Sequence, residues 1–166
     1  MNGEYIKKLD SEKFYEMALP KLKEAIKRDD IDLKKTAGYV QTRIGTFEDI
    51  AKLVDFIDKL PEYSTELYVH KKMKTTEEIS LKSLTEILPV IENITQWNNE
   101  NIYNAMLEKI KEMEIKNVQM FWPVRTALSG EPASPCGASE LAELLGKEDT
   151  IKRIKKGIEL LGGQAD

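Results

Sequence analysis

The sequence predicts an all-α protein built from two small helical bundles packed end to end. Apolar residues recur three or four positions apart along almost the whole chain, and residues that favour helix starts and stops separate these runs. No alternation of apolar and polar residues is long enough to indicate a strand. A length of 166 residues suits one domain or two small ones, and a hydrophobic fraction of 41% can supply a buried core.

Three helices are expected in the first bundle. The first follows Ser11 as its N-cap, and Pro20 inside it should kink or split the helix. The second begins at Asp30 or Asp32, and the third follows Thr46 as its cap and stops before Pro61. Their apolar faces contain Phe14, Met17, Ala18 and Leu22, then Leu33, Ala37, Val40 and Ile44, then Phe47, Ile50, Val54, Ile57 and Leu60.

Residues 61–76 are expected to connect the two bundles, and we place the boundary so that the subdomains span residues 1–66 and 67–166. Thr76 should open a helix that runs to about Asn93, and Asn98 or Asn99 should open the next one. The remaining helices are expected to lead from Asn117 through residues 121–128, and to cover residues 138–145 and 147–161.

Composition excludes several classes of protein. The chain has 33% charged residues and no long apolar run, which excludes a transmembrane span, and its first residues do not form a signal peptide. A single cysteine suits a reducing cytoplasm. The net charge of −4 argues against a general nucleic-acid binder. However, residues 75–116 hold 4 basic and 8 acidic residues, so basic surfaces can form nearer either end.

The most informative stretch lies near the C-terminus. Residues 121–130 read Phe-Trp-Pro-Val-Arg-Thr-Ala-Leu-Ser-Gly, followed by Ser-Pro-Cys-Gly at 134–137 and Leu-Leu-Gly-Lys-Glu at 144–148. An apolar segment thus carries one Arg, ends at a turn of small residues and passes through a Pro-containing loop into a new helix. This arrangement can present an Arg and loop backbone to a flat polar ligand such as a nucleotide base.

This stretch resembles the C-terminal part of bacterial glutamyl-tRNA synthetases. In that family a Pro-hydrophobic-Arg-x-Ala-Leu-[Ser/Thr]-Gly element is followed by [Ser/Thr]-Pro-Gly and Leu-Gly-Lys-Glu. Residues 2–6, Asn-Gly-Glu-Tyr-Ile, look like the segment where the family passes from its catalytic half into its helical half. The resemblance therefore covers essentially the whole chain.

The resemblance implies that the chain is the anticodon-binding half of such a class I synthetase, without a catalytic role of its own. The parent enzymes join glutamate to its tRNA with ATP and Mg²⁺, and no cofactor is expected in this chain. The catalytic motifs should lie upstream of Asn2, which would make Met1 an artificial start. The expected partners are the anticodon stem-loop of tRNA(Glu) and the catalytic half, in a cytoplasmic monomer.

The resemblance also implies a set of site residues. The Arg that matches Arg125 contacts anticodon nucleotides in the family, and a planar donor fork can read a base edge. Ser134, Pro135 and Gly137 belong to a loop whose backbone can meet splayed bases. Here the chain departs from the commonest pattern, because Cys136 replaces a Gly and Gly137-Ala138 replace bulky apolar residues.

Two further groups of basic residues have competing interpretations. Arg43 resembles an Arg that reads the third anticodon position in some members, but it could equally bind carbonyl groups at a helix end. Lys152, Arg153 and Lys156 could contact RNA phosphates, whereas an ordinary solvated helix face would explain them as well. On residue type alone, Arg125 could also be an Arg of an amphipathic helix with its head in water.

Several other motifs do not support a catalytic site. Residues 70–74, His-Lys-Lys-Met-Lys, lack the order and the serines of the ATP loop of class I synthetases. His70 has no second ligand for a metal, and Cys136 has no neighbouring base in the sequence. Two alternatives to the synthetase interpretation remain at this point: a stand-alone paralogue with another RNA or protein partner, and a helical protein-binding scaffold.

Overall fold

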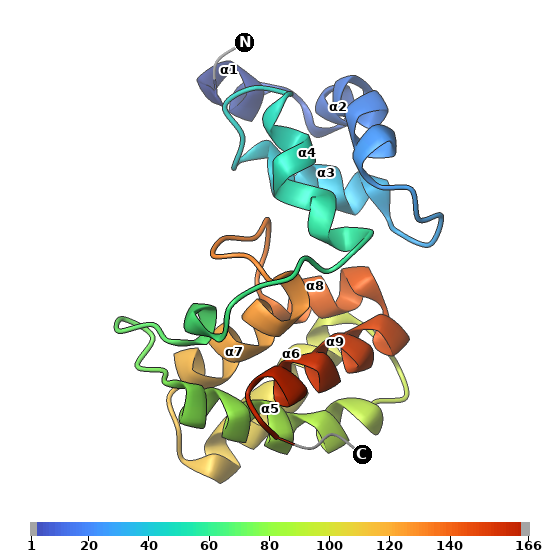
Figure 1. The fold of residues 1–166 in the computed structure, drawn as a ribbon. Helices are drawn as coiled ribbons and strands as arrows, with labels where there is room; N and C mark the ends of the chain where they lie inside the picture. Colours follow the sequence, from blue (N-terminus) through green and yellow to red (C-terminus); the bar gives the residue numbers. More distant parts are fainter. Residues whose placement is uncertain (1–2, 164–166) are drawn as a thin grey trace. The chain divides into compact units, whose positions relative to one another are not determined.

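The computed structural model describes residues 3–163, and almost all of its regular structure is helical (Figure 1). Met1, which was expected to be an artificial start, and Asn2, the first residue of the N-terminal part of the resemblance, lie outside the described residues. The described part contains no strand, only one isolated bridge between His70 and Thr75. The predicted all-α class is therefore confirmed. None of the described helices has the length and apolar character needed to cross a membrane.

Internal contacts divide the chain into two units. The first extends to Lys59 and includes Ala133–Cys136, and the second comprises Leu60–Pro132 and the chain from Gly137 onward. This division falls seven residues before the boundary expected after residue 66, and it assigns a short piece of the later chain to the first unit. The division into functional subdomains at residue 66 stays a prediction.

The first unit contains four α-helices and a short 3₁₀ helix. These are α1 (Gly3–Lys8), α2 (Ser11–Ala25), α3 (Leu33–Gln41), α4 (Asp49–Val54) and η1 (Asp55–Ile57). Helix α2 packs against α3 and α4, and the rings of Phe14 and Phe47 stack with centroids 5.7 Å apart. The buried amide of Gln41 donates to the carbonyls of Ile6 and Leu9, at 3.0 and 2.8 Å, which ties α1 to the end of α3.

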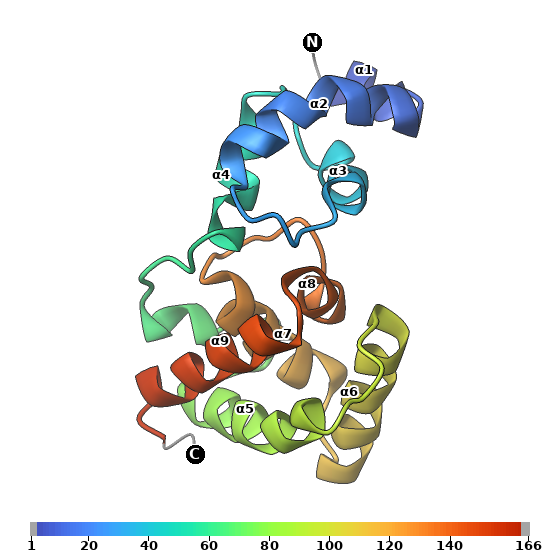
Figure 2. The same ribbon diagram turned by 90° about the vertical axis from the view of Figure 1, so that its right-hand side faces the viewer.

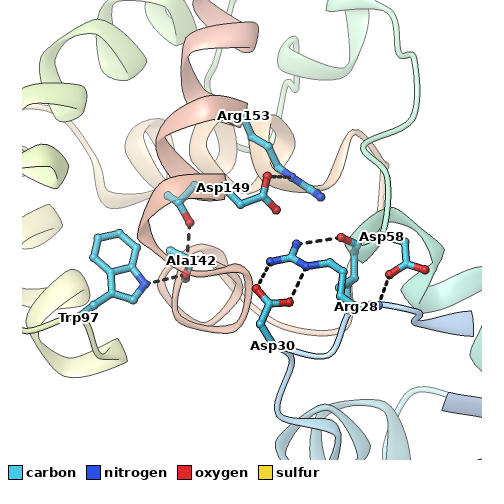
Figure 3. A network of polar contacts seen from close by, with 9 residues as sticks. Arg28, Asp30, Asp58, Trp97, Ala142, Asp149 and Arg153 are labelled. Carbon is cyan, nitrogen blue, oxygen red and sulfur yellow. Dashed lines mark hydrogen bonds and ion pairs between the residues drawn. The ribbon is translucent and has the colours of Figure 1, made fainter. Parts of the chain in front are cut away.

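The loop between α2 and α3 is held by charged residues. Arg28 makes two hydrogen bonds to Asp30, at 2.9 and 2.8 Å, and a third at 3.1 Å to the carbonyl of Ile57 (Figure 3). The backbone N–H groups of Lys27 and Arg28 donate to the carboxylate of Asp58 at 2.7 and 3.1 Å. The hydrogen bonds from Arg28 keep the pKa of Asp30 below its usual value.

The second unit is a bundle of five α-helices with a 3₁₀ turn. Its elements are η2 (Thr65–Tyr68), α5 (Glu77–Glu92), α6 (Asn99–Met113), α7 (Asn117–Ser129), α8 (Ala138–Leu145) and α9 (Lys147–Leu160). Helix α5 contacts α6, α7 and α9, and α7 also contacts α8 and α9 (Figures 1 and 2). The core between them contains Leu84, Ile87, Ile91, Met106, Val124, Leu128, Leu141 and Ile154.

Most predicted helix starts are confirmed by their caps. Asp32, Thr76 and Asn98 each accept a hydrogen bond from the backbone N–H three residues later, at 3.0, 3.1 and 2.8 Å. Each oxygen satisfies a donor that the first helical turn leaves without a partner. The helix expected over residues 138–145 has those bounds, and the one expected over 147–161 ends one residue earlier.

Two local predictions were wrong, and at Pro20 one of the two expected outcomes did not occur. Ser11 is the first residue of α2 and Asp10 occupies the cap position. Pro20 does not split α2: it is exposed, so the carbonyl that it leaves without a donor can face water. The third helix is shorter than expected. It begins at Asp49 instead of following Thr46 and continues as the 3₁₀ turn η1.

Candidate nucleic-acid interface

Helix α7 carries Arg125 and ends in a sharp turn. At its start, the backbone N–H of Lys116 donates to the side chain of Gln119 at 2.9 Å. At its end, Gly130 has a φ of +63°, and its N–H donates to the carbonyl of Thr126 at 2.7 Å. A Cβ at Gly130 would lie 2.9 Å from a ring carbon of Tyr63. Only glycine therefore fits this turn without a shift of the 60–63 segment.

The Arg125 side chain lies along its own helix and is partly buried. Its guanidinium carbon is 4.3 Å from the centroid of the Trp122 ring. One terminal nitrogen donates to Ser129 Oγ at 3.4 Å and the other to the carbonyl of Glu131 at 3.1 Å. Its Nε–H is buried without a hydrogen-bond partner within residues 3–163. The side chain of Arg125 is thus held in place, but its Nε–H donor has no acceptor within the described residues.

The charge of Arg125 is not neutralised by a neighbour. No carboxylate within the described part of the chain forms an ion pair with it. Burial lowers the pKa of Arg125 to about 10, which leaves the guanidinium charged near neutral pH. A partly buried cation without a countercharge is unfavourable, so an anionic or strongly accepting ligand would be stabilised there.

Trp122, on which Arg125 lies, is fixed from two sides. Its indole N–H donates to the carbonyl of Leu67 at 2.9 Å, and the ring of His70 lies 4.4 Å away, tilted by 58°. His70 is held in a turn closed by two backbone hydrogen bonds with Thr75, at 3.2 and 3.1 Å. His70, in the segment 70–74, therefore helps to hold Trp122 beneath Arg125.

The loop after α7 is ordered by its own hydrogen bonds. Ser134 Oγ donates to the carbonyl of Cys136 at 2.8 Å, and the N–H of Gly137 donates to Glu140 at 3.0 Å. Pro135 and Cys136 are buried, Ser134 is half-buried and Gly137 is exposed. Gly137 and part of Ser134 are therefore available to a ligand, whereas Pro135 acts by fixing the loop backbone.

Arg43 lies in the other unit, just after the end of α3. It is exposed, and its guanidinium donates to the carbonyl of Tyr39 at 3.0 Å and to Thr42 Oγ1 at 3.4 Å. This is the carbonyl contact that the competing interpretation expected for a helix-terminal Arg. The exposed guanidinium keeps further donors for a ligand, so a base-reading role for Arg43 stays a prediction.

Arg153 does not belong to a solvated basic face. Its side chain is almost entirely buried, and it donates to the carbonyl of Leu128 at 2.7 Å. It also donates to Asp149 at 3.2 Å (Figure 3). Lys152 and Lys156, on the same helix, are exposed. Lys152 and Lys156 are therefore available for phosphate contacts, whereas Arg153 is not.

A comparison with protein-family models matches residues 13–158 to the anticodon binding domain family. The chain belongs to this family. Similar curated proteins are glutamate–tRNA ligases: 55% identity over 163 residues in Clostridium botulinum strain Eklund 17B, and 50% over 161 residues in Clostridium acetobutylicum. Each alignment covers 97% of this chain and 33% of the relative, so the chain spans about a third of the length of the relatives it matches.

Solved structures agree with the anticodon binding domain fold. A glutamate tRNA ligase from Elizabethkingia meningosepticum, solved in complex with its amino acid, is similar with a TM-score of 0.74 and 25% identity. The match covers 95% of this chain and 31% of that one. The glutamate-tRNA synthetase of Elizabethkingia anophelis gives a TM-score of 0.68 at 22% identity, which shows the shared fold.

One feature of this domain was missed from the sequence. The contact of Trp122 with the Arg125 guanidinium was not anticipated. A signal was present, because residues three apart on a helix share a face, which places Trp122 beside Arg125. The supporting contacts from Leu67 and His70 come from far along the chain and had no such signal.

Proposed function

We propose that this chain is the C-terminal anticodon-binding part of a glutamate–tRNA ligase, and that it binds the anticodon stem-loop of tRNA(Glu). The observation that carries the proposal is Arg125, a positioned and partly buried cation with no carboxylate partner within residues 3–163. A planar guanidinium that lies on a tryptophan can donate to a base edge or a phosphate without losing much side-chain freedom. The anticodon binding domain family and the ligase relatives support this interpretation.

The chemistry of the whole enzyme would belong to the other two thirds of its length. There, glutamate would be joined to tRNA with ATP and Mg²⁺. Residues 3–163 contain no cluster of three His, Cys, Asp or Glu side chains able to hold a metal ion. In a cytoplasmic monomer, this chain would contribute binding and orientation of the tRNA, with Arg125, Ser134 and Gly137 nearest the bases and Pro135 fixing the loop.

The proposal can be tested by measuring the binding of anticodon stem-loops at low salt. The chain should prefer the glutamate anticodon loop over one with a scrambled anticodon. Arg125→Ala should remove most of that preference, a loss of about 1–3 kcal/mol for a bidentate base contact. Arg125→Lys keeps the charge but not the fork, and should lose discrimination while retaining part of the affinity.

Folding must be separated from binding in this test. Arg125→Ala also removes packing against Trp122, so each variant is checked by its helical circular dichroism and its unfolding midpoint. Asn104→Ala, at an exposed position of α6, is the matched control and should bind like the wild type. Equal affinity of the wild type for both loops would contradict anticodon recognition by this chain.

A further inference from the structure

Three helices of the second unit surround a pocket that none of the expected site residues except Gly137 touches. Asn99 and Tyr103 come from α6, Phe121 comes from α7, and Gly137, Ser139 and Glu140 lie at the start of α8. The pocket encloses about 340 Å³, which is within the range of small-ligand sites. Small residues at 137–139 leave this space open, since bulky side chains at these positions would fill it.

Two aromatic rings form one side of the pocket. The rings of Tyr103 and Phe121 are stacked nearly parallel, with an interplanar angle of 12° and centroids 5.5 Å apart. Tyr103 is 41% exposed, which is unusual among the large hydrophobic side chains of the described chain. A partly exposed tyrosine that stacks on phenylalanine offers an aromatic surface on which a planar ligand can stack.

Two polar side chains of the pocket have acceptor capacity that the protein does not use. Asn99 Oδ1 is buried without a hydrogen-bond donor, and no hydrogen bond from residues 3–163 fixes its amide. Because Asn99 lines the pocket, its side-chain oxygen lacks a donor that a ligand could supply. Glu140 accepts the N–H of Gly137 through Oε1, which leaves capacity for a second donor at its carboxylate.

The charge of the pocket favours a base over a phosphate. Its lining residues include the carboxylate of Glu140 and no lysine or arginine. A phosphate would be repelled by that carboxylate, whereas an N–H or NH₂ group would be attracted. The acceptors Asn99 and Glu140 next to a stacking platform therefore fit a flat, uncharged ring with amino groups on its edge.

We propose that this pocket binds a nucleobase of RNA that is turned out of its stack. The base would stack on Tyr103, and its exocyclic amino group would donate to Asn99 or Glu140. Adenine, cytosine and guanine carry such a group, whereas uracil offers only its ring N3–H as a donor, so the pocket should favour the first three. This proposal rests on the proposed RNA-binding function and adds to it a base site separate from Arg125.

The first experiment uses free nucleosides and does not depend on anticodon recognition. Cytidine, adenosine, guanosine and uridine are titrated in turn into the chain, and ring proton shifts of Tyr103 and Phe121 are followed by NMR. We expect these signals to move with the amino-bearing nucleosides and less with uridine. Inorganic phosphate should leave them unchanged. Shifts caused by phosphate alone, or none with any nucleoside up to its solubility, would overturn the proposal.

The second experiment locates the base within the RNA. Binding of an anticodon stem-loop is measured for wild type, Tyr103→Ala and Tyr103→Phe, with the intact loop and with loops in which single bases are removed. Tyr103→Ala should weaken binding of the intact loop at least about five-fold, as expected for one stacked base. Tyr103→Phe keeps the ring and should bind like wild type.

One abasic loop should identify the base in the pocket. If a base stacks on Tyr103, the affinity lost by removing that base and the affinity lost by Tyr103→Ala are not additive. Tyr103→Ala should then bind the loop that lacks this base as well as the wild type does. If Arg125→Ala abolishes anticodon preference but Tyr103→Ala changes no loop, the pocket proposal fails and the proposed function stands. If the chain shows no anticodon preference but the effects of Tyr103→Ala and of one base removal do not add, the pocket proposal stands and the proposed anticodon recognition fails.

Discussion

Arg153 shows how far a single side chain can differ from the role that its residue type suggests. It lies in a run with Lys152, Lys155 and Lys156, and its head was expected in water or on phosphate. Instead it is 4% exposed and bonded to Leu128 and Asp149. Such a buried group contributes to one specific packing of α7 against α9, because its removal takes a donor from the carbonyl of Leu128 and an ion-pair partner from Asp149.

We predict that Arg153→Met lowers the free energy of unfolding by about 3 kcal/mol. Methionine retains much of the aliphatic stem, so the loss comes mainly from the unpaired carbonyl of Leu128 and from Asp149. Urea denaturation measures the change. Lys152→Ala, one position earlier and exposed, is the control and should stay within about 0.5 kcal/mol of wild type. Equal stability of the two variants would show that the contacts of Arg153 contribute nothing.

A second residue-scale prediction concerns pH. Asp49 Oδ2 accepts the backbone N–H groups of Gly45 and Thr46 at 2.9 and 3.0 Å, and these bonds lower its pKa. Because the folded pKa is below the unfolded one, the stabilisation is complete above the unfolded value of about 3.9. This stabilisation disappears as the pH falls through the pKa that Asp49 has in the folded protein.

The carboxyl ¹³C shift of Asp49 should therefore titrate with a midpoint below that of a free aspartate. The stability difference between wild type and Asp49→Asn should shrink as the medium is acidified. A midpoint at or above the free value would be inconsistent with the two hydrogen bonds to Gly45 and Thr46.

At the scale of helices, local chemistry made some boundaries predictable and left others ambiguous. Thr76 was predicted as a cap, and Asp32 and Asn98 were each one of two candidates, because a cap acts through a backbone group three residues away. Thr46 and Asp49 lie close together and both offer oxygen acceptors. The carboxylate of Asp49 accepts the N–H groups of Gly45 and Thr46, which lie before the helix, and the regular helix starts at Asp49. The sequence alone does not show at which of these two residues the regular helix begins.

The glycines of α3 and α9 provide a matched pair of variants. A Cβ at Gly157 would lie 2.5 Å from the hydroxyl oxygen of Tyr68 and 3.1 Å from Leu84, whereas at Gly38 it would meet nothing within 4 Å. We predict that Gly157→Ala destabilises the protein by about 1–3 kcal/mol through overpacking. Gly38→Ala should stabilise it by about 0.5–1 kcal/mol, because alanine favours a helix.

Thermal or urea unfolding distinguishes these two changes. Tyr68→Phe removes the oxygen nearest the added methyl group, so Gly157→Ala should cost less in that background than in wild type. If Gly157→Ala were as favourable as Gly38→Ala, then close approach of α9 to Tyr68 and Leu84 would not be the reason for a glycine at this position.

For the molecule as a whole, net charge gives little information about where RNA would bind. The chain carries −4 overall, yet its proposed contacts include an unneutralised Arg125 and two exposed lysines on α9. The sequence motif correctly led to the family, and it also offered Arg125 as a candidate, whose role stays a prediction. It could not reveal the pocket of Tyr103 and Phe121, since that site depends on the packing of three helices whose residues lie far apart in the chain.

We predict that binding of the anticodon stem-loop weakens steadily as salt rises. Each lysine that neutralises a phosphate adds about 0.7–0.9 to the slope of log affinity against log salt concentration. Lys152→Ala and Lys156→Ala should each reduce the slope by that amount and weaken binding to cognate and scrambled loops alike. Binding titrations at several salt concentrations measure this slope. An unchanged slope would assign both lysines to an ordinary solvated surface.

The buried thiol of Cys136 has a practical consequence. It is the only cysteine of the chain, it is 4% exposed, and its carbonyl accepts the hydrogen bond from Ser134. A thiol reagent can reach the sulfur only when this loop opens, so the labelling rate reports the frequency of opening in the unmodified protein. Labelling that slows when RNA is added would report ligand protection of the 134–137 loop, without any engineered probe.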